Sequence, residues 1–262
     1  MGFLKNWRIR RQEEDSKSVY ISEKFGVRTL HIGSDTVQSS MRLARPHDLE
    51  IAYTRSMMAF LLFHPDPRRM LMIGLGGGSL AKFIYCRFPA VHIVAVEINP
   101  QVVMIAREFF HVPEDDDRIE IVVGDGAAYV AACRQSVDII MVDGYDAESQ
   151  VEALSTSEFY RDCARILGDA GILVVNLWGG DRNFRACVDR LAAAFNGLIA
   201  CLPAGRPGNI AVLAFGRSPG RPRWSELMER ARKLETRYGL EFSRFAQDLA
   251  TMNPHDAERL WL

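Results

Sequence analysis

A glycine-rich turn and three acidic residues carry the chemistry that this sequence could perform. The turn reads Gly74-Leu75-Gly76-Gly77-Gly78-Ser79 and follows the apolar run RMLMI. Glu97, Asp125 and Asp143 each stand at the end of a further apolar run or just after it. Glycines allow positive φ and let a ligand approach the backbone at the start of a helix. Carboxylates accept hydrogen bonds and attract cations. Together these residues indicate a small-molecule site.

The apolar runs themselves predict the scaffold. Seven of them read as strands, with helical segments between the earlier ones: RRMLMIG, VHIVAVE, RIEIVVGD, VDIIMVDG, GILVVNLW, LIACLP and NIAVLAFG. Such continuous apolar runs are typical of a parallel sheet that helices cover on both faces. Asn99-Pro100 predicts a helix start, and the short PAGRPG link predicts an antiparallel hairpin at the end. We therefore expect an α/β fold with a doubly wound, mostly parallel, seven-stranded sheet.

The domain organisation follows from changes along the chain. A helix is predicted over Asp48–Phe63, and Leu227, Ala231, Leu234 and Tyr238 fall on one face of a later helix. We expect four segments: a flexible, charged N-terminus at 1–18, a small antiparallel β segment at 19–47, a nucleoside-binding catalytic domain at 48–220, and a helical extension at 221–262.

Composition argues against several kinds of partner. The net charge is −1, so no strong positive field attracts nucleic acid or an anionic membrane. The longest apolar stretch, Met57–Phe63, is too short to span a bilayer, and no apolar run follows the basic N-terminus as in a signal peptide. The five cysteines form no CxxC pair and the six histidines show no HxxxH or HxH spacing. We expect no metal and a reducing, cytoplasmic location.

The acids are expected to meet at one edge of the sheet, because parallel strands end together there. Glu97 would accept from ribose hydroxyls, Asp125 would accept from an adenine amino group, and Asp143 would face the reacting end of the ligand. Dehydrogenases share the glycine turn and the ribose acid, and the turn could also serve FAD or only packing. A solvated Glu97 and an Asp143 that caps its own turn are structural alternatives. The acids after the third and fourth strands favour a positively charged sulfonium nucleoside.

Residues 20–215 resemble the spermidine synthase (polyamine aminopropyltransferase) family. The motifs that carry the resemblance are DLEIAYTRSMM, IGLGGGS, VAVEINP, VVGDGAAYV, VDIIMVDGYD, LSTSEFYRDC, GILVVNLW and GNIAVLAF. The resemblance implies a small N-terminal β segment before a Rossmann-like domain of the class I methyltransferase type. It also implies decarboxylated S-adenosylmethionine or S-adenosylmethionine as co-substrate, a small-molecule amine as acceptor, and a homodimer.

The resemblance also assigns roles to residues. Asp143 would be catalytic, orienting and deprotonating the attacking amine, and Asp146 would hold the cationic end of that amine. Tyr53 and Tyr145 are candidates to line the acceptor channel. The residues expected to bind the co-substrate are Gly74, Gly76, Gly78, Ser79, Glu97, Asp125 and Gly126.

Four departures from the family pattern concern donor and acceptor identity. Ser79 stands where the family carries an aspartate, and Arg55 stands where it carries a glutamate. The family's Asp-Ser-Ser-Asp is here Asp143-Gly144-Tyr145-Asp146, and its Tyr-Gln pair is not evident in the β segment. An S-adenosylmethionine-dependent methyltransferase on the same fold, or a non-catalytic nucleoside- or polyamine-binding relative, therefore remain alternatives. The nucleoside released distinguishes them.

Overall fold

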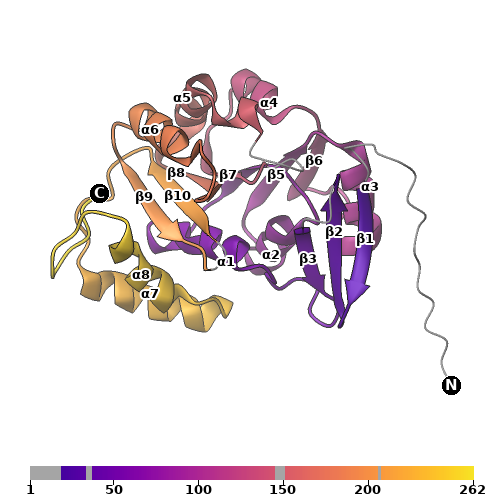
Figure 1. Ribbon diagram of the computed structural model, residues 1–262, viewed down its shortest axis with the longest axis horizontal. Helices are drawn as coiled ribbons and strands as arrows, with labels where there is room; N and C mark the ends of the chain where they lie inside the picture. The colour runs from indigo at the N-terminus through magenta and orange to yellow at the C-terminus, as the bar shows by residue number, and fades with distance from the viewer. Residues whose placement is uncertain (1–18, 34–36, 145–150, 206–207) are drawn as a thin grey trace.

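A computed structural model describes residues 19–33, 37–144, 151–205 and 208–262. These residues form two sheets (Figure 1). The first is antiparallel and consists of β1 (Val19–Lys24), β2 (Val27–Ile32) and β3 (Val37–Arg42). The second has seven strands in the order β6-β5-β4-β7-β8-β10-β9. The predicted α/β fold with a small N-terminal antiparallel sheet is thus confirmed.

All seven strands of the large sheet lie at the predicted runs, although β8 begins four residues before its run GILVVNLW. Their bounds are β4 Arg69–Ile73, β5 His92–Glu97, β6 Ile119–Val123, β7 Val137–Val142, β8 Leu167–Trp178, β9 Ile199–Pro203 and β10 Asn209–Phe215. Strands β4 to β8 are parallel, and β10 runs antiparallel to both β8 and β9. The predicted closing hairpin is therefore present, and β10 begins at the edge where β8 ends.

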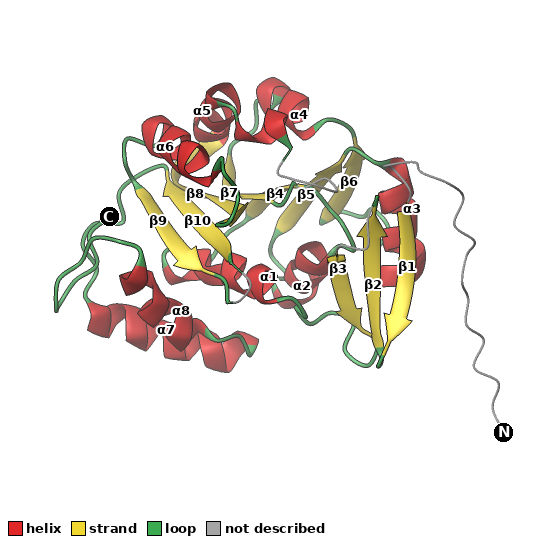
Figure 2. Cartoon of the chain, in the orientation of Figure 1, coloured by secondary structure: helices red, strands yellow, loops and turns green. Residues whose placement is uncertain are grey.

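Helices cover both faces of this sheet, as Figure 2 shows. Helices α4, α5 and α6 lie over one face, and α1, α2, α7 and α8 lie on the other side (Figures 1 and 2). The helical bounds are α1 Ala52–Met57, η1 Met58–Leu62, α2 Ser79–Arg87, α3 Pro100–Phe110, α4 Gly126–Ala132, η2 Glu152–Ser155, α5 Ser157–Ile166, α6 Phe184–Ala194, α7 Trp224–Tyr238, α8 Phe242–Asp248 and η3 Leu249–Thr251. The predicted Asn99 cap of α3 is present, since its side chain accepts from Gln101 N.

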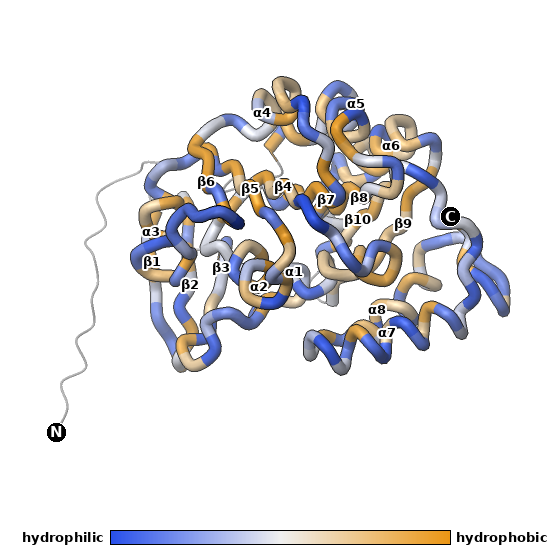
Figure 3. Tube along the Cα trace, turned by 180° about the vertical axis from the view of Figure 1, so that it is seen from behind, coloured by the Kyte–Doolittle hydropathy of each residue, from blue (hydrophilic) through white to orange (hydrophobic). Residues whose placement is uncertain are grey.

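Alternation along each strand divides the core between the two faces. In β4, Met70 and Met72 pack with the apolar residues of α1, α2, α7 and α8, while Leu71 and Ile73 pack with those of α4, α5 and α6. This period of two places successive side chains on opposite faces of the sheet. Figure 3 shows the apolar strands inside the layer of helices. Because both faces are buried, the sheet is rigid enough to fix whatever its edge carries.

The small sheet packs against α2 and α3 of the larger unit. Leu30 and Met41 form an apolar cluster with Val102 and Phe110. Lys82 of α2 is buried beneath this contact, where its ammonium donates to Phe110 O at 2.6 Å. Burial lowers the pKa of Lys82 to about 8, because the charged form loses its hydration. The contact brings β3 next to the glycine turn.

The helix predicted over Asp48–Phe63 was wrong in its extent. It begins only at Ala52 and changes to a 3₁₀ helix at Met58. The Arg55 guanidinium donates to the carbonyls of Leu49 and Glu50, which therefore accept from a side chain. The four residues predicted on one helix face near the C-terminus are all buried in α7. Within the described ranges, no helix has the length and apolarity to cross a bilayer.

Candidate active site

The glycine turn after β4 is shaped by close approach of the backbone. Gly74 has φ 93°, and a Cβ there would lie 2.3 Å from Asp143 O. Only glycine fits such a contact at positive φ. Gly76 and Gly78 also have positive φ, at 53° and 66°. The backbone of the turn after β4 thus packs directly against the end of β7, where Asp143 lies.

A cavity of about 650 Å³ opens at this edge of the sheet. Four acids line it, and among the described lining residues none is lysine, arginine or histidine. The acids are Glu97, Asp125, Asp143 and Asp181. The other candidate residues that line the cavity are Gly74, Gly76, Ser79, Gly126 and Tyr53, whereas Gly78 is not among the lining residues. Tyr145 and Asp146 lie outside the described residues. A pocket of this charge suits a cationic ligand.

Glu97 is held in place by the backbone around it. Its Oε2 accepts from Leu75 N at 2.9 Å and its Oε1 accepts from Asn99 N at 3.0 Å. The side chain is 9% exposed. Each carboxylate oxygen has a second lone pair that can accept from a ligand hydroxyl. The structural alternative of a solvated Glu97 is excluded, because both oxygens are fixed at the wall of the cavity.

Asp125 is likewise fixed by backbone. It is the N-cap of α4, where its Oδ1 accepts from Ala128 N at 3.0 Å. The next residue, Gly126, lies so close to β4 that a Cβ would meet Ile73 Cγ2 at 2.4 Å. Asp125 therefore has a capping role as well as a place in the cavity lining. Its other oxygen remains able to accept from a ligand.

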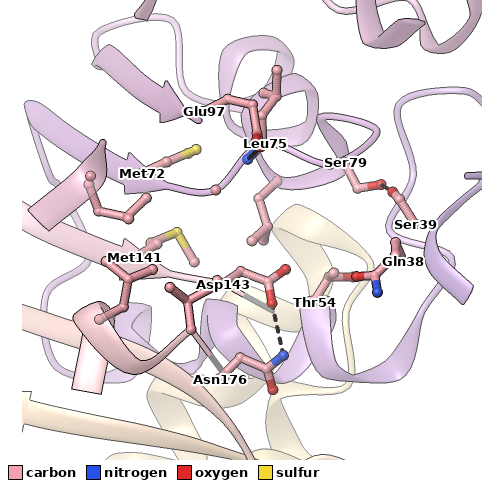
Figure 4. Close-up of a pocket in the computed structure, with 18 of the residues that line it drawn as sticks. Gln38, Ser39, Thr54, Met72, Leu75, Ser79, Glu97, Met141, Asp143 and Asn176 are labelled. Carbon is pink, nitrogen blue, oxygen red and sulfur yellow. Dashed lines mark hydrogen bonds between the residues drawn. The ribbon is translucent and has the colours of Figure 1, made fainter. Parts of the chain in front are cut away.

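Asp143 belongs to a network of side chains, part of which Figure 4 shows. Tyr53 donates its hydroxyl to Oδ2 at 2.9 Å, and Asn176 donates its amide to Oδ1 at 2.9 Å. Asn209 in turn donates to Asn176 Oδ1 at 3.0 Å. The described contacts of the carboxylate are thus to side chains, whereas the following turn, which Asp143 would cap in the structural alternative, lies outside the described residues.

The environment of Asp143 also shifts the pKa of its carboxyl group. Burial raises the pKa of the Asp143 carboxyl above its usual range. The hydrogen bonds from Asn176 and Tyr53 oppose this increase, and the charge of Glu97 adds to it. A carboxylate with a raised pKa is a better proton acceptor than an ordinary one.

The small sheet supplies one wall of the cavity. Ser39 of β3 lies with its Oγ 3.2 Å from Oγ of Ser79, at the start of α2. A Cβ on Gly77 would lie 2.7 Å from the same Ser39 oxygen. The neighbouring Gln38 also lines the cavity (Figure 4). Gln38 was not predicted from sequence, because the run VQSSMR of β3 was not recognised as a strand.

Arg55 has a structural role in place of a site role. Its guanidinium pairs with Glu241 at 3.0 Å and donates to two backbone carbonyls. Arg55 does not line the cavity, although its neighbours Tyr53 and Thr54 do. The position where the family carries a glutamate therefore joins α1 to the C-terminal helices.

Four further polar lining residues were missed from sequence: Thr54, Asn176, Asp181 and Asn209. Asn176 is 3% exposed within the apolar run GILVVNLW. A polar side chain inside a buried strand needs a partner, and that was the available signal. Asp181 and Asn209 stand in polar surroundings and gave no such signal.

The fold and this acidic edge define the class of the protein as an α/β domain with a small-molecule cavity at the carboxyl ends of its parallel strands. The sequence pattern of the "Spermine/spermidine synthase domain" matches residues 50–177. A "Polyamine aminopropyltransferase" of Chromobacterium violaceum is 47% identical over 253 residues, which are 97% of each chain. The chain therefore belongs to the spermine/spermidine synthase family of transferases.

Solved structures agree with this fold. A spermidine synthase in complex with the transition state analogue AdoDATO has a TM-score of 0.63 at 22% identity, over 82% of this chain and 78% of that one. Human Methyltransferase-like protein 13 in complex with SAH has a TM-score of 0.65 at 26% identity, over 72% and 92%. The methyltransferase-like architecture is thus common to both solved structures, and the family is shown by the 47% identity to the Chromobacterium violaceum relative. The described residues contain no group of three or more side chains that could hold a metal ion.

Proposed function

We propose that this protein transfers an aminopropyl group from decarboxylated S-adenosylmethionine to a small-molecule amine. The observation that carries the proposal is the cavity itself, which has four acidic lining residues and no basic one among those described. Both reactants are cations at neutral pH, one a sulfonium and the other an ammonium. The same surroundings would disfavour a nicotinamide cofactor, whose phosphates are anionic.

The donor side of the proposal uses the ends of β4, β5 and β6. Glu97 would accept hydrogen bonds from the ribose hydroxyls, and Asp125 with Gly126 would hold the adenine. Gly74 and Gly76 would let the nucleoside approach the backbone, and Ser79 would lie near the aminopropyl end. These roles are supported by the fixed carboxylates of Glu97 and Asp125, each of which has an accepting lone pair left.

The reaction side uses the end of β7. A neutral amine nitrogen attacks the carbon attached to the sulfonium, a carbon–nitrogen bond forms, and the carbon–sulfur bond breaks. The electron pair of that bond goes to sulfur, which leaves as a thioether, and the new ammonium loses a proton. Asp143 would orient the acceptor and take the proton that its ammonium must lose before the attack, because its raised pKa and fixed carboxylate suit a general base, and the proton from the new ammonium goes to solvent.

The test is a product assay with the purified protein. It is incubated with decarboxylated S-adenosylmethionine and putrescine, and the products are identified by mass spectrometry. We expect methylthioadenosine and the aminopropylated amine in equal amounts. The Asp143→Asn variant in the same assay is the matched control. Release of S-adenosylhomocysteine from S-adenosylmethionine, with no methylthioadenosine from the decarboxylated donor, would assign the protein to methyl transfer instead.

Assembly and location remain predictions. We propose a homodimer on the family resemblance, and a cytoplasmic location because the five cysteines of the sequence form no CxxC pair. Sedimentation equilibrium of the purified chain measures the assembly, and a monomer at micromolar concentration would contradict it. Fractionation of cells that express the tagged chain measures the location.

A further inference from the structure

The order of strands divides the cavity into a donor end and a far end. Reading along the sheet, Asp125 follows β6, Glu97 ends β5, the glycine turn follows β4, and Asp143 follows β7. The next strand is β8, and Asp181 comes three residues after its last residue, Trp178. Adjacent strands lie about 4.8 Å apart. Asp181 therefore lies on the side of Asp143 away from the two acids assigned to the nucleoside.

The local structure holds Asp181 in one orientation. Its N–H donates to Trp178 O at 3.0 Å, and its Oδ1 accepts from Asn183 N at 2.7 Å. The side chain is half-buried and lines the cavity. Within the described part of the chain, Asp181 forms no ion pair, and its Oδ2 accepts no hydrogen bond. The carboxylate is thus fixed by backbone but keeps its charge and one whole oxygen for a ligand.

We propose that Asp181 binds the second, protonated nitrogen of a diamine acceptor and so selects diamines over monoamines. The inference rests on the proposed function, in which the first nitrogen lies at Asp143. Trp178, the last residue of β8, also lines the cavity, and an aromatic ring suits contact with the methylene chain of the acceptor. Arg55 does not line the cavity, and no lysine, arginine or histidine is among the described lining residues, so none of these repels an ammonium there. Asp181 is a binding residue at that end.

The experiment measures amine binding without turnover. Calorimetry with the methylthioadenosine-saturated protein compares putrescine with n-butylamine, which has the same carbon chain and one nitrogen fewer. In Asp181→Asn, affinity for putrescine should fall about tenfold, as expected for the loss of a charged hydrogen bond. Affinity for butylamine and for methylthioadenosine should not change. Steady-state kinetics should show the same change as a higher KM for putrescine with kcat retained.

The matched control is Asp189→Asn. Asp189 is an exposed acid on the following helix, where it pairs with Arg185. The Asp189→Asn substitution also removes one negative charge, but Asp189 does not line the cavity. The affinities for putrescine and butylamine should therefore stay at their wild-type values. A control that lowers putrescine affinity as much as Asp181→Asn does would mean a general charge effect and would overturn the proposal.

Two further results would overturn it. Equal losses for putrescine and butylamine in Asp181→Asn would make Asp181 a structural residue of the loop. Full putrescine affinity in Asp181→Asn, with a tenfold loss in Asp146→Asn, would return the cationic end to Asp146, as the resemblance implies. Amine binding is measured apart from turnover. Absence of aminopropyl transfer would therefore contradict the proposed function, and the binding comparison would still decide whether Asp181 binds the second nitrogen.

Discussion

The two halves of the cavity are built in different ways. On the donor half, Glu97 and Asp125 are fixed by backbone N–H groups a few residues away or on the adjacent turn. On the acceptor half, Asp143 is fixed by Tyr53 and Asn176, which are 90 and 33 residues away in the chain. Backbone atoms hold a group wherever the strand and turn exist, whereas a side-chain network depends on every member. Substitutions in the acceptor half should therefore affect the donor half less than substitutions in the donor half affect the acceptor half.

The largest effect expected is that of Asp143→Asn, which should separate the two halves completely. The amide keeps the shape of the side chain but can no longer accept a proton. Turnover should fall by about 10²–10⁴-fold, the usual cost of losing a positioned base. Affinity for methylthioadenosine, measured by calorimetry, should stay within a factor of two or so. A variant that keeps more than half of wild-type turnover would contradict the catalytic role.

The second prediction concerns donor choice at Ser79, where the two halves meet. Ser79 is uncharged, so nothing at this turn repels the carboxylate of intact S-adenosylmethionine. In Ser79→Asp, two like charges about 4 Å apart would cost on the order of 4 kcal/mol, or about a thousandfold in affinity. The start of α2 and the Ser39 hydroxyl can accommodate the new carboxylate.

Calorimetry with both donors on both proteins measures this difference. The wild type should bind S-adenosylmethionine measurably, and Ser79→Asp should lose that binding while keeping the decarboxylated donor. A wild-type preference for the decarboxylated donor of a thousandfold or more would show that selectivity arises elsewhere. Ser79→Ala is the matched control, because it removes the hydroxyl without adding charge and should preserve the wild-type preference.

The same contrast explains what could be predicted from sequence. The seven strands, the glycine turn and the acids of the donor half belong to single strand–turn–helix units, whose signals lie within a few residues. The roles of Asn176 in β8 and Asn209 in β10 depend on which strands become neighbours. The two strands pair because the chain turns back after β9 in the closing hairpin and places β10 between β9 and β8. The place of Gln38 in the cavity wall depends on how the small sheet packs against α2. No local pattern encodes such contacts.

The early helix shows a second limit of the same kind. Its predicted start at Asp48 followed from local signals, but Arg55 pairs with Glu241 in the C-terminal helices and donates to the carbonyls of Leu49 and Glu50. The carbonyls before Ala52 thus accept from a side chain that a tertiary contact holds, and no local pattern encodes that contact. The four-residue apolar face of α7 was predicted correctly, because that pattern is local to one helix.

A smaller effect is expected for Glu97→Gln, which tests the donor half. The substitution replaces a charged acceptor by an amide with only one accepting oxygen. The amide nitrogen would face either Leu75 N or Asn99 N, which are both donors. A charged hydrogen bond contributes about 1.5–3 kcal/mol, so methylthioadenosine affinity should fall at least about tenfold. Unchanged affinity in a folded variant would remove Glu97 from the nucleoside site.

The smallest effect expected is a shift in pH dependence for Asn176→Leu, which weakens the acceptor-side network without removing its acid. Burial raises the pKa of Asp143, and the Asn176 amide opposes that increase. Leucine has no donor, so the pKa of Asp143 should rise further. Catalysis needs the ionised carboxylate, and at a given acidic pH a smaller fraction of it would be ionised. The acid limb of kcat/KM should therefore move to higher pH.

The pH profile of kcat/KM, measured with one acceptor for all variants, checks this sign. The protonation of the amine itself is then common to every curve and cancels in the comparison. Tyr53→Phe should move the limb in the same direction, because it removes the other donor to Asp143. Asn209→Leu should move it less, because Asn209 contacts Asp143 only through Asn176. A loss of activity that is equal at all pH values in Asn176→Leu would mean that Asn176 positions Asp143 without tuning its ionisation.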